Sequence, residues 1–159
     1  MTLVRQPNQL PADVAASVEA AAESLLIIWD RGLDGIRPRV SASQLRALLV
    51  VDQHQPINLS RLAEELGAIP SSASRLCDRL EAAGLLTRRT SPEDRREIAL
   101  SLTGEGSRLL DELRAARRAE LSEVLAAMTP STRAALLTGL RGFQHAAASR
   151  LGHEQDKPA

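Results

Sequence analysis

The sequence predicts an α+β fold that is mostly α, and three observations support this. Over most of the 159-residue chain, apolar residues recur every three or four positions, the period of an amphipathic helix. The segment Ile98–Thr103 instead alternates apolar and polar residues, as a half-buried strand does. With one Phe, one Trp and no Tyr, Leu and Ala must fill the core, and both favour helices. The expected order is four helices, two strands and two helices, with a one-residue strand contact at Ile57.

The composition is that expected of a cytoplasmic protein without a membrane partner. No apolar run approaches the ~20 residues that a membrane-spanning helix needs, and residues 1–10 read as a loose arm without the apolar core of a signal sequence. The single Cys77 excludes an intramolecular disulfide, and the histidines are too scattered for a metal site. No catalytic constellation or phosphate-binding loop is recognisable. We therefore expect no metal, no cofactor and no enzymatic activity.

Two helices are predicted in the first third of the chain. Helical spacing of apolar residues runs from Pro11 or Asp13 to about Leu33, and Gly32, Gly35 and Pro38 end that helix. Ser41, followed three residues later by Gln44, makes a capping box that opens a second helix.

Segment 58–84 has the pattern of two helices joined by a tight turn. Asn58 suits the N-cap of the first helix, and Gly67 suits its end. Pro70 suits the first position of the next helix, because its missing N–H would be unpaired there anyway. Two helices joined in this way, the second with a polar outer stripe, form the helix-turn-helix arrangement that enters the DNA major groove.

The second of these helices carries chemistry suited to double-stranded DNA. On a helical wheel, Ala73, Leu76, Cys77 and Leu80 cluster on one side. Ser71, Arg75, Arg79 and Ala82 cluster on the other, which therefore carries a stripe of Ser and Arg. Arg75 or Arg79 can bind guanine O6 and N7 with two parallel hydrogen bonds. Ser71 and Ser72, near the helix N-terminus, suit phosphate contacts. The alternative is a solvated helix face, which the neighbouring turn and hairpin disfavour.

A hairpin with an arginine-rich tip follows, with strands expected at 85–90 and 98–103. Asp94, Arg95 and Arg96 lie at the turn between them, where an arginine can enter the minor groove. Asp94 is expected to orient the Arg96 guanidinium by a salt bridge. For Arg95, solvated charge is an equally good interpretation.

The arginines of this region matter more by their position than by their number. The net charge is zero, but arginines outnumber acidic residues between Ser71 and Arg96. Arg88 and Arg89 face opposite sides of their strand, so at most one of them points toward the DNA phosphates.

Two helices are predicted after the hairpin. Thr103 suits the N-cap of a helix of about 25 residues, whose charged, Ala-rich middle (114–120) is expected to cross open solvent. Thr129-Pro130 starts the last helix.

Short matches to a known family run through residues 41–110. They are Gln44-Leu45, Leu62-Ala63 with Leu66, Ser74-Arg75-Leu76, Asp78-Arg79-Leu80-Glu81, Gly84-Leu85, Asp94-x-Arg96, Ile98-x-Leu100-x-Leu102-Thr103 and Gly106. Through their combination this segment, and more loosely the whole chain, resembles the multiple antibiotic resistance regulator (MarR) family of winged-helix transcription factors. One departure is Ile69, which stands where the family usually has Ser or Thr. A cap worth ~1 kcal/mol is missing there unless Ser71 or Ser72 supplies it.

The resemblance implies a homodimer joined by the first, fifth and sixth helices, with a recognition helix in each of two adjacent major grooves and the wing in the flanking minor groove. It implies a sequence-specific transcriptional regulator, a repressor on a pseudo-palindromic operator. The expected domains are an arm and dimerisation helix (1–36), a winged helix-turn-helix lobe (37–103), a C-terminal long helix and dimerisation helix (104–152) and a flexible tail (153–159). The expected DNA-binding residues are Ser71, Ser72, Ser74, Arg75, Arg79, Arg88, Asp94, Arg95 and Arg96.

Two further features each have two interpretations. A small-molecule effector that releases the DNA is a further expected partner, with a pocket lined by Trp29, Leu33, Leu45 and Leu49. Alternatively, Trp29 packs in the dimer core. Cys77 is expected to be a structural residue beside Leu76 and Leu80 rather than a peroxide sensor.

A different interpretation of the whole chain is a winged-helix protein interaction module that does not read DNA. The arginine-tipped hairpin and the Ser/Arg helix face argue against it.

Overall fold

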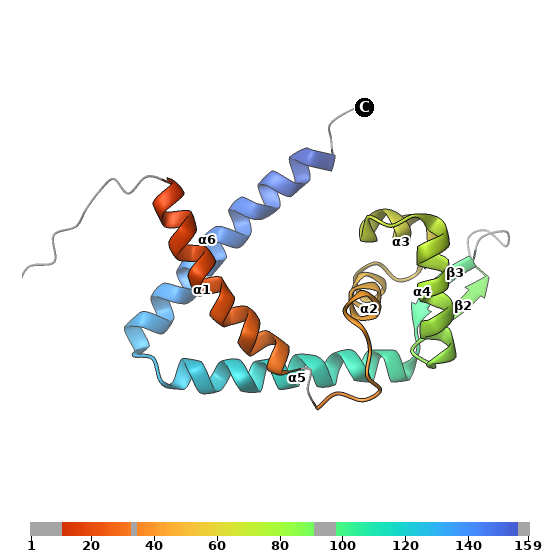
Figure 1. Ribbon diagram of the computed structural model, residues 1–159, viewed down its shortest axis with the longest axis horizontal. Coiled ribbons are helices and arrows are strands. Elements are labelled where there is room, and N and C mark those ends of the chain that lie inside the picture. The colour runs from red at the N-terminus through yellow and green to blue at the C-terminus, as the bar shows by residue number, and fades with distance from the viewer. Residues whose placement is uncertain (1–10, 33–34, 91–97, 156–159) are drawn as a thin grey trace, which may run out of the picture. The chain divides into compact units, whose positions relative to one another are not determined.

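The computed structural model describes the backbone of residues 11–32, 35–90 and 98–155, and side chains within 13–149 of these ranges. The helices are α1 (Pro11–Arg31), α2 (Ala42–His54), α3 (Leu59–Leu66), α4 (Pro70–Ala82), α5 (Gly104–Ala126) and α6 (Pro130–Gln155), and the strands are β1 (Ile57–Asn58), β2 (Leu86–Thr90) and β3 (Ile98–Leu102) (Figure 1). The predicted α+β, mostly helical fold is confirmed. Contacts divide the chain into one compact unit up to Arg118 and a second from Ala119 onward.

Within the described residues, a small antiparallel sheet has the strand order β1-β3-β2. The central strand, β3, places Leu100 opposite Ile57 of β1 and opposite Arg88 of β2. Leu100, Ile57 and Leu86 are buried, so the sheet closes one side of the lobe core. The expected one-residue contact at Ile57 is a two-residue strand.

The alternation expected along β3 holds only in part. Leu100 is buried as expected, but the expectation that Ile98 is buried with it is wrong, because Ile98 is 58% exposed; Ala99, expected on the outer side, is buried. The two residues of β1 pair only with Ala99 and Leu100. Ile98 therefore extends past the part of the sheet that has strands on both sides.

The core of the lobe is built from leucines of α2, α3, α4, α5 and the sheet. Its largest fully buried members include Leu48, Leu62, Leu80, Leu85, Leu86, Leu100, Leu110 and Leu113. In the part of the chain that the structure describes, no polar or charged side chain is buried. The lobe is thus an apolar core whose polar side chains all reach the surface.

The predicted helix caps of the lobe are confirmed. The Ser41 hydroxyl accepts a hydrogen bond from the Gln44 N–H (3.2 Å), and the Gln44 side chain accepts one from the Ser41 N–H (2.8 Å). Asn58 Oδ1 accepts from the Arg61 N–H at 2.9 Å. Gly67 ends α3 in the left-handed conformation with φ 62°, which glycine adopts without strain.

Thr103 anchors the start of α5 to the turn before β2. Its hydroxyl accepts a hydrogen bond from the Gly106 N–H (3.0 Å) and donates one to the Gly84 carbonyl (2.6 Å). This draws the first turn of α5 against Leu85, so closely that a Cβ on Gly106 would lie 2.1 Å from the Leu85 carbonyl oxygen. The predicted cap at Thr103 is confirmed. The close approach to Leu85 also explains why position 106 holds a glycine, which has no Cβ.

The sequence predicted that the middle of α5 crosses open solvent, and for Arg114 and Arg117 this is wrong. Arg114 donates a hydrogen bond to Asp52 of α2 at 2.5 Å, which raises the pKa of Arg114. The Arg117 guanidinium lies 4.5 Å from the ring centroid of Trp29 on α1, and burial lowers the pKa of Arg117. These charges have partners far away in the sequence, which helical periodicity cannot reveal.

Large apolar side chains are exposed mainly on the terminal helices. On α1 they are Val14, Val18, Leu25, Leu26, Ile27 and Trp29, and on α6 they are Leu136, Leu137, Leu140 and Phe143. In the described ranges, no helix has the length and apolar character to span a membrane.

Candidate nucleic-acid interface

Helix α4 separates its side chains as the helical wheel predicted. Ala73, Cys77 and Leu80 are fully buried, whereas Arg75 and Arg79 are exposed. Of its serines, Ser71 and Ser72 are exposed and Ser74 is half-buried. Because successive residues turn by about 100°, positions four apart lie on the same side, so the two arginines share one outward stripe.

The start of α4 has no side-chain cap. Ile69 is the N-cap residue and makes no side-chain capping bond; its carbonyl accepts from the N–H groups of Ser72 (3.0 Å) and Ala73 (3.1 Å). Pro70 occupies the first turn, as predicted. The Ile69 side chain is 65% exposed, so burial of its apolar surface contributes little to offset the missing capping hydrogen bond.

The outward arginines of α4 are free to bind an external partner. Among the described residues, Arg75 and Arg79 have no hydrogen bond and no ion pair. Each guanidinium therefore keeps its fork of N–H donors for base edges or phosphates.

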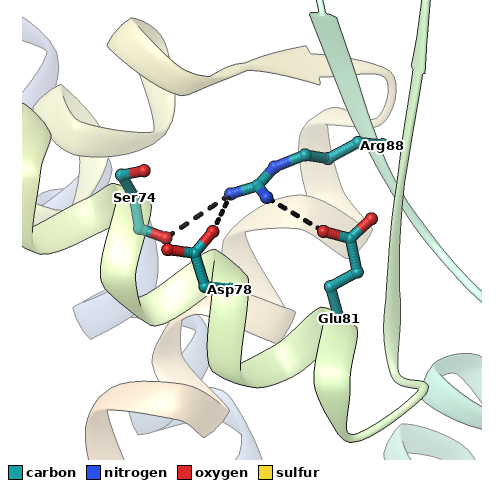
Figure 2. Close-up of polar contacts among 4 residues, drawn as sticks. All are labelled: Ser74, Asp78, Glu81 and Arg88. Atoms are coloured by element: carbon teal, nitrogen blue, oxygen red, sulfur yellow. Dashed lines mark hydrogen bonds and ion pairs between the residues drawn. The ribbon is translucent and has the colours of Figure 1, made fainter.

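Arg88 of β2 instead binds back onto α4 (Figure 2). Its Nη2 donates to Asp78 Oδ1 at 2.7 Å, and its Nη1 donates to Glu81 Oε2 at 2.9 Å. A longer contact of 3.5 Å joins Nη2 to the Ser74 carbonyl. The hydrogen bond that Arg88 donates to Asp78 is the main cause that raises the pKa of Arg88, so the guanidinium stays charged throughout the physiological pH range.

This arrangement, which we call the Arg88 clamp (Arg88, Asp78 and Glu81), has two consequences. It ties the first strand of the wing to the recognition helix. It also pairs both carboxylates of α4 with one guanidinium, which offsets one of their two negative charges. The sequence analysis listed Arg88 among the DNA-binding residues and did not consider the two acidic residues of α4 as its partners.

We predict that Arg88→Met loosens the wing without removing a phosphate contact. Exposed ion pairs contribute ~0.2–1 kcal/mol each, so the free energy of unfolding should fall by about 1 kcal/mol for the two. The slope of log affinity against log salt should stay that of the wild type. Urea denaturation and DNA titrations at several salt concentrations measure both quantities.

The matched control is Asp78→Asn combined with Arg88→Met. If the ion pair carries the stability loss, the double variant loses less than the sum of the single losses. A salt slope lowered by about 0.9 per half-site would instead identify Arg88 as a direct phosphate contact.

Comparison with known proteins agrees with this geometry. Residues 40–98 match the model of the MarR family. The chain is 31% identical over 127 residues to the HTH-type transcriptional repressor MdtR of Bacillus subtilis (strain 168). The aligned region spans 79% of this chain and 80% of that protein. The chain belongs to the MarR family. It is a winged-helix, DNA-binding regulator of transcription, as the other members are.

Two solved structures share the fold of this MarR-family chain. The crystal structure of RV1404 from Mycobacterium tuberculosis has a TM-score of 0.82 and 29% identity, over 89% of this chain and 97% of that one. Streptococcus pneumoniae FabT, solved in complex with DNA, has a TM-score of 0.67 and 19% identity, over 87% of this chain and 97% of that one. At that identity, FabT shows the fold alone.

Four predicted site residues of this MarR-family chain are not described by the structure. Asp94, Arg95 and Arg96, the expected wing tip, lie outside the described residues, and so does Leu33. Arg89, on the opposite side of β2 from Arg88, is exposed and has no partner among the described residues.

Of the four residues expected around an effector, the three that the structure describes do not line one pocket together. Leu45 lines a pocket of about 220 Å³ with Ile36, Pro38, Arg39, Val40, Leu109 and Leu113. Among the described residues, Trp29 and Leu49 are not part of that lining: Trp29 stacks with Arg117, and Leu49 packs against the core of the lobe.

Cys77 has the environment of a structural residue. It is fully buried in α4, it is a free thiol, and burial raises its pKa. The reactive form of a cysteine is the thiolate, which this site disfavours. This is the environment expected for a packing residue.

Proposed function

We propose that this MarR-family chain is a sequence-specific repressor that binds a pseudo-palindromic operator as a homodimer in the cytoplasm. The observation that carries the proposal is the outward stripe of α4, where Arg75 and Arg79 are exposed and have no partner among the described residues. Both carboxylates of α4, Asp78 and Glu81, are ion-paired with Arg88. The proposal requires no cofactor, metal or catalytic group.

Each contact has a role in the proposed complex. Arg75 and Arg79 read base edges in the major groove, where a bidentate arginine pairs with guanine. The remaining proposed contacts go to phosphates, from Ser71, Ser72 and Ser74 near the start of α4, and to the minor groove, from Arg95 and Arg96 at the expected wing tip. Asp94 is proposed to orient Arg96 rather than to contact DNA. Arg88 is a positioning residue in this scheme.

The exposed apolar side chains of α1 and α6 support the proposed homodimer. Clusters of exposed apolar side chains, such as those on α1 and those on α6, are each typical of an interface with another protein. A twofold partner also fits the DNA, because two recognition helices about 34 Å apart enter successive major grooves on one side of the duplex. We therefore propose that the terminal helices join the two subunits.

An effector would act through this spacing. A small molecule that binds better to a dimer with a different distance between recognition helices weakens DNA binding by that difference in affinity. The pocket beside Leu45, between α2 and α5, is a site where such a ligand could bind without touching DNA.

A mobility-shift titration against the DNA upstream of the protein's own gene tests the proposal. At moderate salt we expect a discrete shift, two protein chains per operator by light scattering, and weaker binding when either half-site is scrambled. No shift, or binding that is indifferent to sequence, would favour the protein interaction module instead. Double replacement of Arg75 and Arg79 by alanine should abolish the shift while the melting temperature is preserved.

A further inference from the structure

A groove lies beside the outward stripe of α4 and has a volume of about 360 Å³. Its walls come from α2, from the end of α3 and the turn after it, and from α4. They are formed by Ser43, Arg46, Leu66, Ala68, Ser72, Ala73, Arg75, Leu76 and Arg79. Both proposed base-reading arginines thus belong to one concave surface, together with a third arginine that the sequence did not single out.

The groove carries uncompensated positive charge. Arg46, Arg75 and Arg79 line it together, and its lining includes no carboxylate. In the described part of the chain, none of the three has a hydrogen bond or an ion pair. Positive charge that no carboxylate of the lining offsets favours an anion beside the groove, and arginine matches the geometry of phosphate.

We propose that this groove binds a backbone phosphate of the half-site that α4 reads, and that Arg46 of α2 is its anchor. The inference rests on the proposed function and extends the interface to a helix outside the helix-turn-helix and the wing. DNA is the occupant because the groove is continuous with the stripe of α4, so a duplex that reaches Arg75 and Arg79 also covers the groove. The Ser43 and Ser72 hydroxyls on the lining provide further donors.

A phosphate anchor has a measurable signature in the salt dependence of binding. Each neutralised phosphate contributes about 0.9 to the slope of log affinity against log salt, or about 1.8 for two half-sites. Doubling the salt concentration should therefore weaken the wild type about 3.5-fold more than Arg46→Ala. Because phosphates carry no sequence information, operator and non-operator DNA should lose affinity by the same factor.

Arg46→Lys and Arg108→Ala are the matched controls. The lysine keeps the charge and should keep the wild-type slope. Arg108 lies on α5, exposed and paired with Glu105, outside the groove, so its loss removes the same charge with no expected effect on the slope. Thermal melting of all variants confirms that they fold.

The inference is overturned if Arg46→Ala keeps the wild-type salt slope, or if it weakens operator binding while leaving non-operator binding intact. The second result would make Arg46 a base reader. Failure of the proposed function looks different, because the wild-type protein itself would then not distinguish its operator from other DNA.

Discussion

Replacing Arg75 by alanine is expected to lower the affinity for the operator by ~1–3 kcal/mol and to relax the base preference at one position of each half-site. The reason is that Arg75 is exposed on α4, with no partner in the described part of the chain, so its donors are free for a base edge. Binding to a set of operators with each base pair changed in turn measures both effects.

The decisive measurement is which base pair of the operator each variant no longer discriminates, rather than how much its overall affinity falls. Wild type should penalise one base change strongly, and Arg75→Ala should no longer do so. Arg79→Ala should relax a different position, and Arg108→Ala none. A uniform loss over all sequences, with a smaller salt slope, would show that Arg75 contacts a phosphate and that the proposed base reader is wrong.

Gly106→Ala is expected to destabilise the lobe by ~1–3 kcal/mol or more, the usual cost of forcing extra atoms into a packed site. Its Cβ would lie 2.1 Å from the Leu85 carbonyl oxygen and 3.1 Å from the Leu85 carbonyl carbon. These are backbone atoms, so relief requires α5 to move away from the turn before β2. Urea denaturation measures the loss.

Gly104→Ala provides the control for this substitution. Gly104 begins the same helix, and a Cβ there would meet nothing within 4 Å. Since alanine favours a helix more than glycine does, Gly104→Ala should be neutral or slightly stabilising. Equal stability of the two variants would contradict the close approach of Gly106 to Leu85.

Local rules accounted for most of the fold and for the direction of the α4 side chains. The capping box of Ser41 and Gln44, the cap at Asn58 and the glycine end at Gly67 each depend on residues within a few positions of one another. The same holds for the two sides of α4, because a helix repeats its orientation every 3.6 residues. Ile69 was already recognisable as a residue that provides no cap.

Long-range contacts decided what these rules missed. Ile98 obeys the alternation of a strand, yet it is exposed because β1 is too short to reach it. Arg114 looked like solvated charge until the fold brought Asp52 beside it. Arg46 on α2 shares a groove with α4 only because the core holds the two helices together.

The sequence by itself determined the helices, their ends, the hairpin strands and the outward stripe of serine and arginine on α4, since hydrogen bonds between near neighbours and the burial of apolar faces suffice for these. Only the tertiary structure decided which arginines are available. It pairs Arg88 with carboxylates seven and ten residues away in sequence and leaves Arg75, Arg79 and Arg46 beside a common groove. The residue type gives the charge of a side chain. Whether an opposite charge already pairs with it depends on which distant group the folded backbone places within a few ångströms.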